Sequence, residues 1–101
     1  MTIEFLVEFD VQVPDGTSGS EVEQRTRAEA LAAAGLATDG HLLRLWRPTA
    51  AAGDPTALGL YAADSRAELD ALLRALPLAD WMRVTVVPLA PHPNDPARNA
   101  R

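Results

Sequence analysis

Cysteine is absent from the 101 residues, which excludes disulfide bonds, thiolate zinc sites and cysteine nucleophiles. The sequence also lacks any run of about 20 apolar residues, the length that a membrane-spanning helix needs. Its first residues alternate between apolar and polar side chains, which is not the pattern of a signal peptide. These absences predict a cytoplasmic protein without a membrane partner.

Positive charge is scarce, with nine Lys and Arg residues against fourteen Asp and Glu residues and a formal net charge of -5. A nucleic-acid backbone would be repelled by such a field, so we expect no nucleic-acid partner. No Gly-rich phosphate loop, nucleophile elbow or His-x-x-His pattern occurs. Kinase, hydrolase and metalloenzyme functions therefore have no support, and we expect no metal site.

Almost half of the residues are apolar, and this fraction is typical of a packed globular chain. A chain of this length forms one domain and lies near the lower size at which a single core suffices. We expect a folded domain over residues 1–90, followed by a Pro-rich, extended C-terminal tail over residues 91–101.

Four segments have the patterns of strands. Apolar residues occupy the odd positions from Ile3 to Val13, which predicts a strand with one buried face. Pro14, Asp15 and Gly16 end it as a turn. Further strands are expected over residues 41–47, 56–63 and 81–89, with residues 49–55 forming a loop between the second and third.

Two segments have the patterns of helices. Ser20 and Glu23 form a potential capping box before an alanine-rich helix that extends over residues 22–37. Ser65 and Glu68 form a second capping box, before leucines at helical spacing that stop at Pro77. On the first helix, Val22, Arg25, Glu29, Ala32, Ala33 and Leu36 share one face. Leu31 falls outside that face.

The resulting βαββαβ order predicts an α+β, ferredoxin-like sandwich, in which two helices cover one face of a four-stranded antiparallel sheet. The other face has no helix to cover it, although the second and fourth strands carry large apolar side chains on both parities. An uncovered apolar face usually marks a partner surface, so we expect a homo-oligomer.

Three segments resemble the muconolactone Δ-isomerase family: MTIEFLVEFDVQVP at the N-terminus, GHLLRLWR at residues 40–47 and LPLADWMRVTVVPLAPHP at residues 76–93. The resemblance implies the ferredoxin-like fold in a dimeric α/β-barrel type assembly, with decamers as the larger form. It also implies an enzyme without cofactors that isomerises muconolactone to 3-oxoadipate enol-lactone in catechol degradation, a pathway of aromatic catabolism.

Two positions depart from the family pattern. Arg44 stands where the family usually has a histidine before Leu-Trp-Arg, and the third strand has Pro55 and Ala57 in place of an aromatic residue and an asparagine. Both changes affect polar groups expected around the substrate. They leave the fold assignment intact and make the substrate less certain than the family.

Glu29 is the candidate catalytic base. Shifting a double bond moves a proton between two carbons, which requires a base of tuned pKa and donors for the oxyanion that develops. Glu29 is the acid on the apolar face of the first helix, and it aligns with a glutamate of the family. The alternative is a surface ion pair with Arg25 one turn earlier.

A substrate carboxylate requires a cation, and Arg44 and Arg47 are the candidates on the second strand. Alternation places them on opposite faces, and Arg44 is preferred because it shares parity with Leu42 and Trp46. An intersubunit ion pair from Arg44 to Glu8 or Asp10 is an equally good interpretation.

Arg25, His41, Trp46 and Tyr61 are assigned to substrate binding. Trp46 and Tyr61 could line a pocket, although such residues are more often core or interface aromatics. His41 could replace the missing family histidine, although an exposed histidine at a strand end is the simpler explanation. His92 lies in the tail, where we expect it to order the chain rather than to bind a metal.

Three functions follow in order of preference. The first is isomerisation of a small unsaturated lactone, with muconolactone as the default. The second is a related isomerase or cyclase in another pathway. The third is a non-catalytic oligomeric domain that binds a small molecule, and fold alone cannot choose among them.

Overall fold

The computed structural model describes residues 1–49 and 55–99. Its elements are β1 (Ile3–Val11), α1 (Gly19–Thr38), β2 (Leu42–Trp46), β3 (Ala57–Ala63), α2 (Arg66–Arg74), η1 (Ala79–Trp81), β4 (Met82–Leu89) and η2 (Pro96–Asn99). This is the expected βαββαβ order with two short 3-10 helices added. Most of the predicted loop over residues 49–55 lies outside the described residues.

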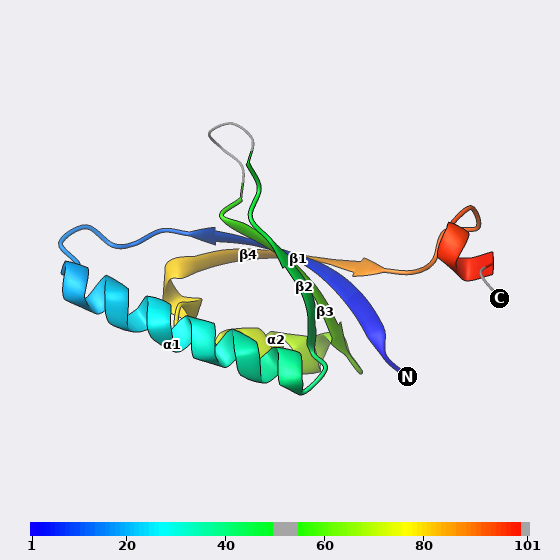
Figure 1. Ribbon diagram of the computed structural model, residues 1–101, viewed down its shortest axis with the longest axis horizontal. Helices are drawn as coiled ribbons and strands as arrows, with labels where there is room; N and C mark the ends of the chain where they lie inside the picture. The colour runs from blue at the N-terminus through cyan, green and yellow to red at the C-terminus, as the bar shows by residue number, and fades with distance from the viewer. Residues whose placement is uncertain (50–54, 100–101) are drawn as a thin grey trace.

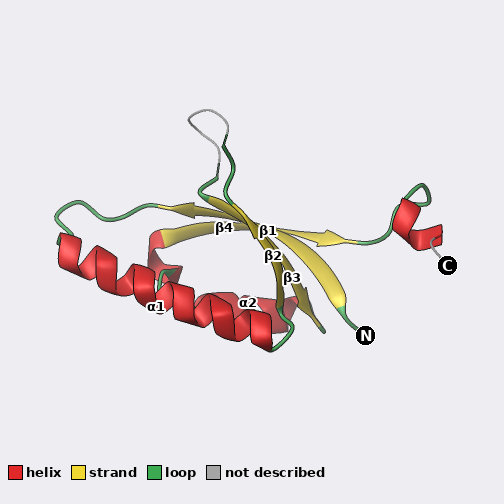
Figure 2. Ribbon diagram, in the orientation of Figure 1, coloured by secondary structure: helices red, strands yellow, loops and turns green. Residues whose placement is uncertain are grey.

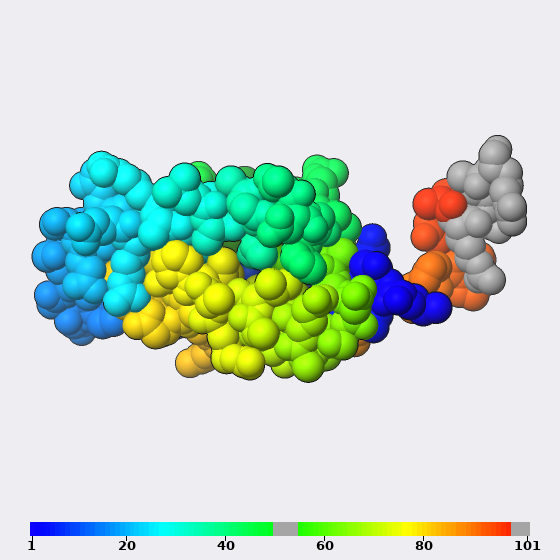
Figure 3. All heavy atoms as spheres, turned by 90° about the horizontal axis from the view of Figure 1, so that it is seen from below, coloured from blue at the N-terminus to red at the C-terminus, as the bar shows by residue number. Residues whose placement is uncertain are grey.

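The four strands form one antiparallel sheet in the order β2-β3-β1-β4. Both helices lie against the same face of this sheet, as Figures 1 and 2 show. Seen from the helix side, α1 and α2 lie next to each other and cover that face (Figure 3). The ferredoxin-like α+β prediction is confirmed.

Alternation along β1 determines where the core lies. Phe5, Val7 and Phe9 are 2%, 0% and 4% exposed and face the helices. They pack against Tyr61 and Ala63 of β3, Leu42 of β2, and Leu69, Leu73 and Leu76 from α2 and the residues that follow it. On α1 the contacts come from Ala32, Ala33 and Leu36, which belong to the predicted face, whereas Leu31 is 76% exposed.

The predicted N-cap is correct for α2 and wrong for α1. Ser65 caps α2 as expected, because its side-chain oxygen accepts a hydrogen bond from the Glu68 amide at 3.0 Å. The Ser20 cap on α1 is wrong. Ser18 has the extended backbone that a cap needs and accepts from the Glu21 amide at 3.1 Å, so Ser20 lies inside the helix.

A bulge interrupts the pairing of β2 with β3. Leu42 lies opposite Tyr61, while Arg44 lies opposite Leu60, so two steps along β2 match one step along β3. Side chains beyond the bulge therefore change face, and Leu45 opposite Gly59 faces the helices. This change decides whether Arg44 of β2 or Arg47, which follows β2, faces α1.

No helix of the described residues covers the face of the sheet away from α1 and α2 (Figure 1). By the strand register it carries apolar side chains from three strands: Leu6, Leu58, Leu60, Val87 and Leu89. Val87 and Leu89 are 41% and 39% exposed. This open sheet face is the apolar surface expected for self-association.

The C-terminal segment leaves β4 and runs away from the sheet (Figure 1). The prediction of an extended tail is wrong for residues 96–99, which form η2. Asp95 precedes Pro96 and accepts a hydrogen bond from the Ala97 amide at 3.0 Å, the arrangement that starts a helical turn. His92 orders the turn before it by accepting from the Asn94 amide at 2.9 Å.

Candidate active site

A cavity of about 570 Å³ lies between α1 and the sheet, at the end where β1 and β2 finish and β3 and β4 begin. Its lining includes Glu29, Trp46, Arg47 and Tyr61, all of which the sequence offered as candidates. The rest of the wall comes from Phe9, Val11, Thr26, Ala30, Ala33, Leu45, Thr56, Ala57, Leu78 and Met82. This volume is ordinary for a small-molecule site, and most of its wall is apolar.

Small side chains create this space. Ala30 and Ala33 of α1 face Ala57 of β3 across it, where larger residues would fill the gap. Gly59 extends the effect, because an added Cβ would lie 2.5 Å from Cε1 of Tyr61. The Tyr61 ring therefore lies back over Gly59, two residues earlier on the same face of the strand.

Glu29 projects from α1 into the cavity and is half-buried. One carboxylate oxygen, Oε1, accepts a hydrogen bond from the Leu78 amide at 3.0 Å. Burial raises the pKa of Glu29 above its usual value, and the Leu78 hydrogen bond opposes part of that rise. A carboxyl group with a raised pKa is a stronger base than an exposed one.

Tyr61 is 3% exposed and shares the cavity with Glu29. Burial, with a smaller contribution from the Glu29 charge, raises the pKa of Tyr61 to about 12. The Phe9 ring packs edge-on against it, with ring centres 6.0 Å apart. Its hydroxyl therefore stays protonated at neutral pH and is available as a hydrogen-bond donor.

Arg47, not Arg44, lies in the cavity wall. The preference for Arg44 rested on regular alternation along the strand, and the bulge in β2 reverses that alternation. Arg44 pairs with Leu60 on the open sheet face, and its guanidinium lies 5.1 Å from the centre of the Trp46 ring. Trp46 pairs with Leu58 and has the same parity as Arg44, but it is the last residue of the edge strand and also lines the cavity.

Arg25 does not line the cavity and does not pair with Glu29. Its guanidinium bonds Glu21 at 3.3 Å and Asp80 at 2.6 Å, and it lies 4.4 Å from the centre of the Trp81 ring. The surface ion pair between Arg25 and Glu29 is therefore wrong, and the assignment of Arg25 to substrate binding has no support from this cavity.

His41 also lies outside the cavity wall. Its Nδ1 is 2.8 Å from the Ala62 carbonyl oxygen, so it carries the proton and donates across to the neighbouring strand. The same residue accepts a backbone hydrogen bond from the Ala62 amide at 2.8 Å. His41 thus secures the start of β2 and does not take the place of the missing family histidine in this cavity.

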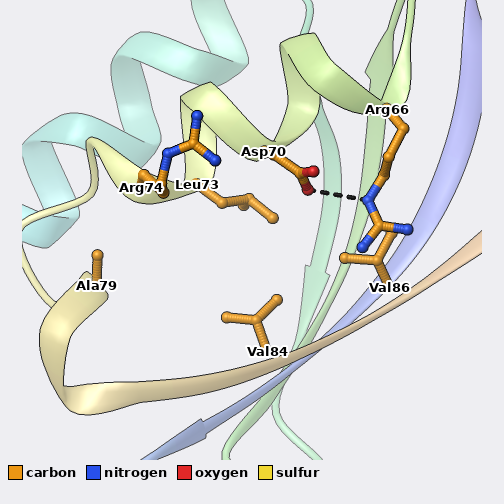
Figure 4. A pocket seen from close by; sticks show the side chains of 7 residues that line it. All are labelled: Arg66, Asp70, Leu73, Arg74, Ala79, Val84 and Val86. Atoms are coloured by element: carbon orange, nitrogen blue, oxygen red, sulfur yellow. Dashed lines mark hydrogen bonds and ion pairs between the residues drawn. The ribbon is translucent and has the colours of Figure 1, made fainter.

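A second, smaller hollow of about 190 Å³ lies between α2 and β4 (Figure 4). Its charged residues are Arg66, Asp70 and Arg74, all on α2. Figure 4 shows Arg66 joined to Asp70, with Nε and Oδ1 2.9 Å apart. Its acid and one of its two cations neutralise each other on an exposed helix surface, so this hollow is the weaker candidate.

Within residues 1–49 and 55–99, no three His, Asp or Glu side chains come together in a group that could hold a metal ion. Over the same residues, no helix is long and apolar enough to cross a membrane. Among the side chains of the cavity wall, Glu29 can exchange a proton, and Tyr61 and Arg47 can donate hydrogen bonds.

The fold and the cavity define a small ferredoxin-like α+β domain with a half-buried carboxyl group facing an apolar cavity. Comparison with known families is more specific: residues 3–95 match the family described as muconolactone delta-isomerase. The chain belongs to this family.

Individual relatives agree. The chain is 31% identical over 93 residues to Muconolactone Delta-isomerase 1 of Acinetobacter lwoffii, with 89% of this chain and 91% of the relative covered. It is 30% identical to Muconolactone Delta-isomerase of Cupriavidus pinatubonensis, with coverages of 89% and 95%. The crystal structure of a muconolactone isomerase superposes with a TM-score of 0.78 at 27% identity, covering 90% and 92% of the two chains.

The sequence ranked one group of this site too low and gave no sign of another. Arg47 was a candidate but came second to Arg44, because no residue pattern predicts the bulge. The Leu78 amide was missed because a backbone donor leaves no side-chain signature. The alanines of α1 were interpreted as helix formers, yet Ala30 and Ala33 opposite Ala57 were the available sign of a cavity.

Proposed function

We propose that this chain is a muconolactone delta-isomerase, converting muconolactone to 3-oxoadipate enol-lactone. Family membership, the two curated relatives and the 0.78 structural match support this activity. The observation that carries it is the position of Glu29. This residue is half-buried, held by the Leu78 amide and directed into an apolar cavity that also contains a cation and a neutral phenol.

The reaction moves one proton and one double bond. A base removes the proton from the γ-carbon of the conjugated lactone, and the electron pair spreads through the ring onto the carbonyl oxygen as a dienolate. The same proton-carrying group then delivers a proton to the α-carbon, which leaves the double bond between the β- and γ-carbons. Substrate and product have the same composition, so no other reactant is consumed.

Glu29 is assigned as the group that carries the proton. Its raised pKa makes it a stronger base than an exposed glutamate and a competent acid once protonated. Desolvation is the principal cause, so closing the cavity around a substrate increases the effect.

Arg47 and Tyr61 are assigned to the two anionic parts of the reacting molecule. Muconolactone carries a carboxylate on its side chain, and the guanidinium of Arg47 in the cavity wall matches that group. The dienolate oxygen needs a donor that remains neutral, and the Tyr61 hydroxyl meets that requirement because its pKa is about 12.

Turnover of muconolactone, followed by ultraviolet absorbance, tests the proposal directly. We expect Glu29→Gln to lower kcat by at least about a hundredfold, because Gln fills the same space and accepts the Leu78 hydrogen bond but cannot take a proton. Glu23→Gln is the matched control, since Glu23 lies on the same helix in an exposed ion pair with Arg27. Full activity in Glu29→Gln would remove Glu29 as the base, while an inactive wild type would point to another substrate.

We infer that the protein works in the cytoplasm as a homo-oligomer, with a dimer through the open sheet face as the building block and a decamer as the larger form. The apolar open sheet face supports this, since Val87 and Leu89 are 41% and 39% exposed. Sedimentation equilibrium of the wild type and Leu60→Glu tests it. Leu60 lies at the centre of that face, so the variant should dissociate. A monomeric wild type would contradict the inference.

A further inference from the structure

Arg25 connects α1 to the segment 77–81, which joins α2 to β4. Its Nη1 donates to the Pro77 carbonyl at 3.3 Å and to Oδ1 of Asp80 at 2.6 Å. Its guanidinium also lies over the Trp81 ring, at 4.4 Å from the ring centre. One side chain therefore contacts the beginning and the end of this short segment.

Glu29 lies one helical turn after Arg25 and contacts the same segment between those two points. Its Oε1 accepts from the Leu78 amide at 3.0 Å, and Leu78 follows Pro77 directly. Residues four apart on a helix lie on one face, so both side chains reach down from α1 to the same place. The partner of Glu29 is a main-chain group, and its direction depends on how the segment is held.

We propose that Arg25 is a positioning residue, which holds segment 77–81 so that the Leu78 amide faces Glu29 and thereby sets the proton affinity of that carboxyl group. The effect of Arg25 on catalysis rests on the proposed function. Its effect on the Glu29 carboxyl group does not, because the contacts between Arg25, the segment and Glu29 lie within the folded protein.

Of the residues that the structure describes, those that share the cavity with Glu29 place no second carboxylate beside it. Tyr61 from β3 is neutral and Arg47 follows β2, while β1 and β4 present only Phe9, Val11 and Met82. Burial favours the neutral carboxyl group and the Leu78 hydrogen bond favours the charged one. If the segment is released, that hydrogen bond is lost, burial acts unopposed and the pKa of Glu29 rises.

Asp80→Asn separates positioning from a direct effect of charge, and Arg25→Gln tests whether Arg25 acts on Glu29 at all. Asp80→Asn removes a negative charge and the ion pair with Arg25, which weakens the hold of Arg25 on the segment. Direct electrostatics predicts that the pKa of Glu29 falls in this variant, whereas positioning predicts that it rises. Arg25→Gln should raise it too. Arg27→Gln is the control, because Arg27 makes an i,i+4 ion pair on the same helix, with Glu23, but is 76% exposed.

The experiment is an NMR titration of the Glu29 side-chain carboxyl carbon in wild type and the three variants, with amide spectra to verify folding. A raised midpoint in Asp80→Asn and Arg25→Gln, with no change in Arg27→Gln, is the expected result. An unchanged or lowered midpoint in Asp80→Asn would overturn the proposal. Asp80 has a 67% exposed side chain, so this variant remains informative even if Arg25→Gln does not fold.

The kinetic arm follows kcat/KM for muconolactone against pH. On the acid limb we expect about a threefold to tenfold loss in Arg25→Gln and Asp80→Asn, the amount that one charge-assisted hydrogen bond supplies. Activity should recover at higher pH, which a merely disrupted fold would not allow. A shifted titration with no turnover in wild type would reject the proposed function alone, and turnover without any shift would reject only the role of Arg25.

Discussion

The space between the helices and the sheet is tightly packed at one end and hollow at the other. At the α2 end, Phe5, Val7, Leu69 and Leu73 fill the space, and none is more than 6% exposed. At the other end, alanines on α1 and β3 enclose the cavity that contains Glu29. α1 contains no fully buried residue, whereas α2 buries Leu69 and Leu73.

This difference separates the part of the molecule that stabilises it from the part that does chemistry. Close packing at the α2 end supplies apolar burial and fixes the sheet. The hollow end buries less apolar surface, and its cavity can hold a ligand next to the Glu29 carboxyl group. Tyr61 belongs to both ends, since it lies in the core cluster and in the cavity wall.

The largest effect should come from the packed end. Leu69→Ala removes a fully buried side chain and is expected to lower the free energy of unfolding by about 2–5 kcal/mol. Leu31→Ala changes the same side chain at a 76% exposed position and should cost no more than about 0.5 kcal/mol. Urea denaturation measures both, and equal losses would break the distinction between packed and exposed leucines.

Tyr61 should show a pH effect because it lies between the two ends. Its folded pKa of about 12 exceeds the usual tyrosine value of 10.0, so its stabilising contribution is complete below pH 10 and disappears as the pH rises toward 12. Wild type should lose about 2–3 kcal/mol over this range relative to Tyr61→Phe, from about 1.4 kcal/mol for each pH unit between the two values. Parallel stability curves from urea denaturation would mean that the hydroxyl is not buried.

The hollow end should show the smallest effect on stability and a clear one on activity. Ala33→Leu places an isobutyl group in the cavity, so we expect at least about a tenfold loss of kcat/KM with little change in unfolding. Ala34→Leu, on the neighbouring exposed position of the same helix, is the control and should keep full activity. Equal kinetics in both variants would show that the substrate does not occupy this cavity.

Much of the fold was predictable because it depends on local patterns. Odd-numbered apolar residues in β1 specified its buried face, and Ser65 with Glu68 specified where α2 begins. The cap of α1 was misplaced because Ser18 and Ser20 both offer a hydroxyl at the right distance from a glutamate. Only the backbone geometry at Ser18 distinguishes them.

For the site, the sequence by itself determined that Glu29 lies on the inner face of its helix, since helical periodicity fixes which side a residue occupies. Tertiary structure decided what meets it there. A bulge brought Arg47 into the cavity in place of Arg44, and the path of segment 77–81 gave Glu29 the Leu78 amide in place of Arg25. Strand registers and loop paths arise from contacts between distant segments, which no local pattern contains.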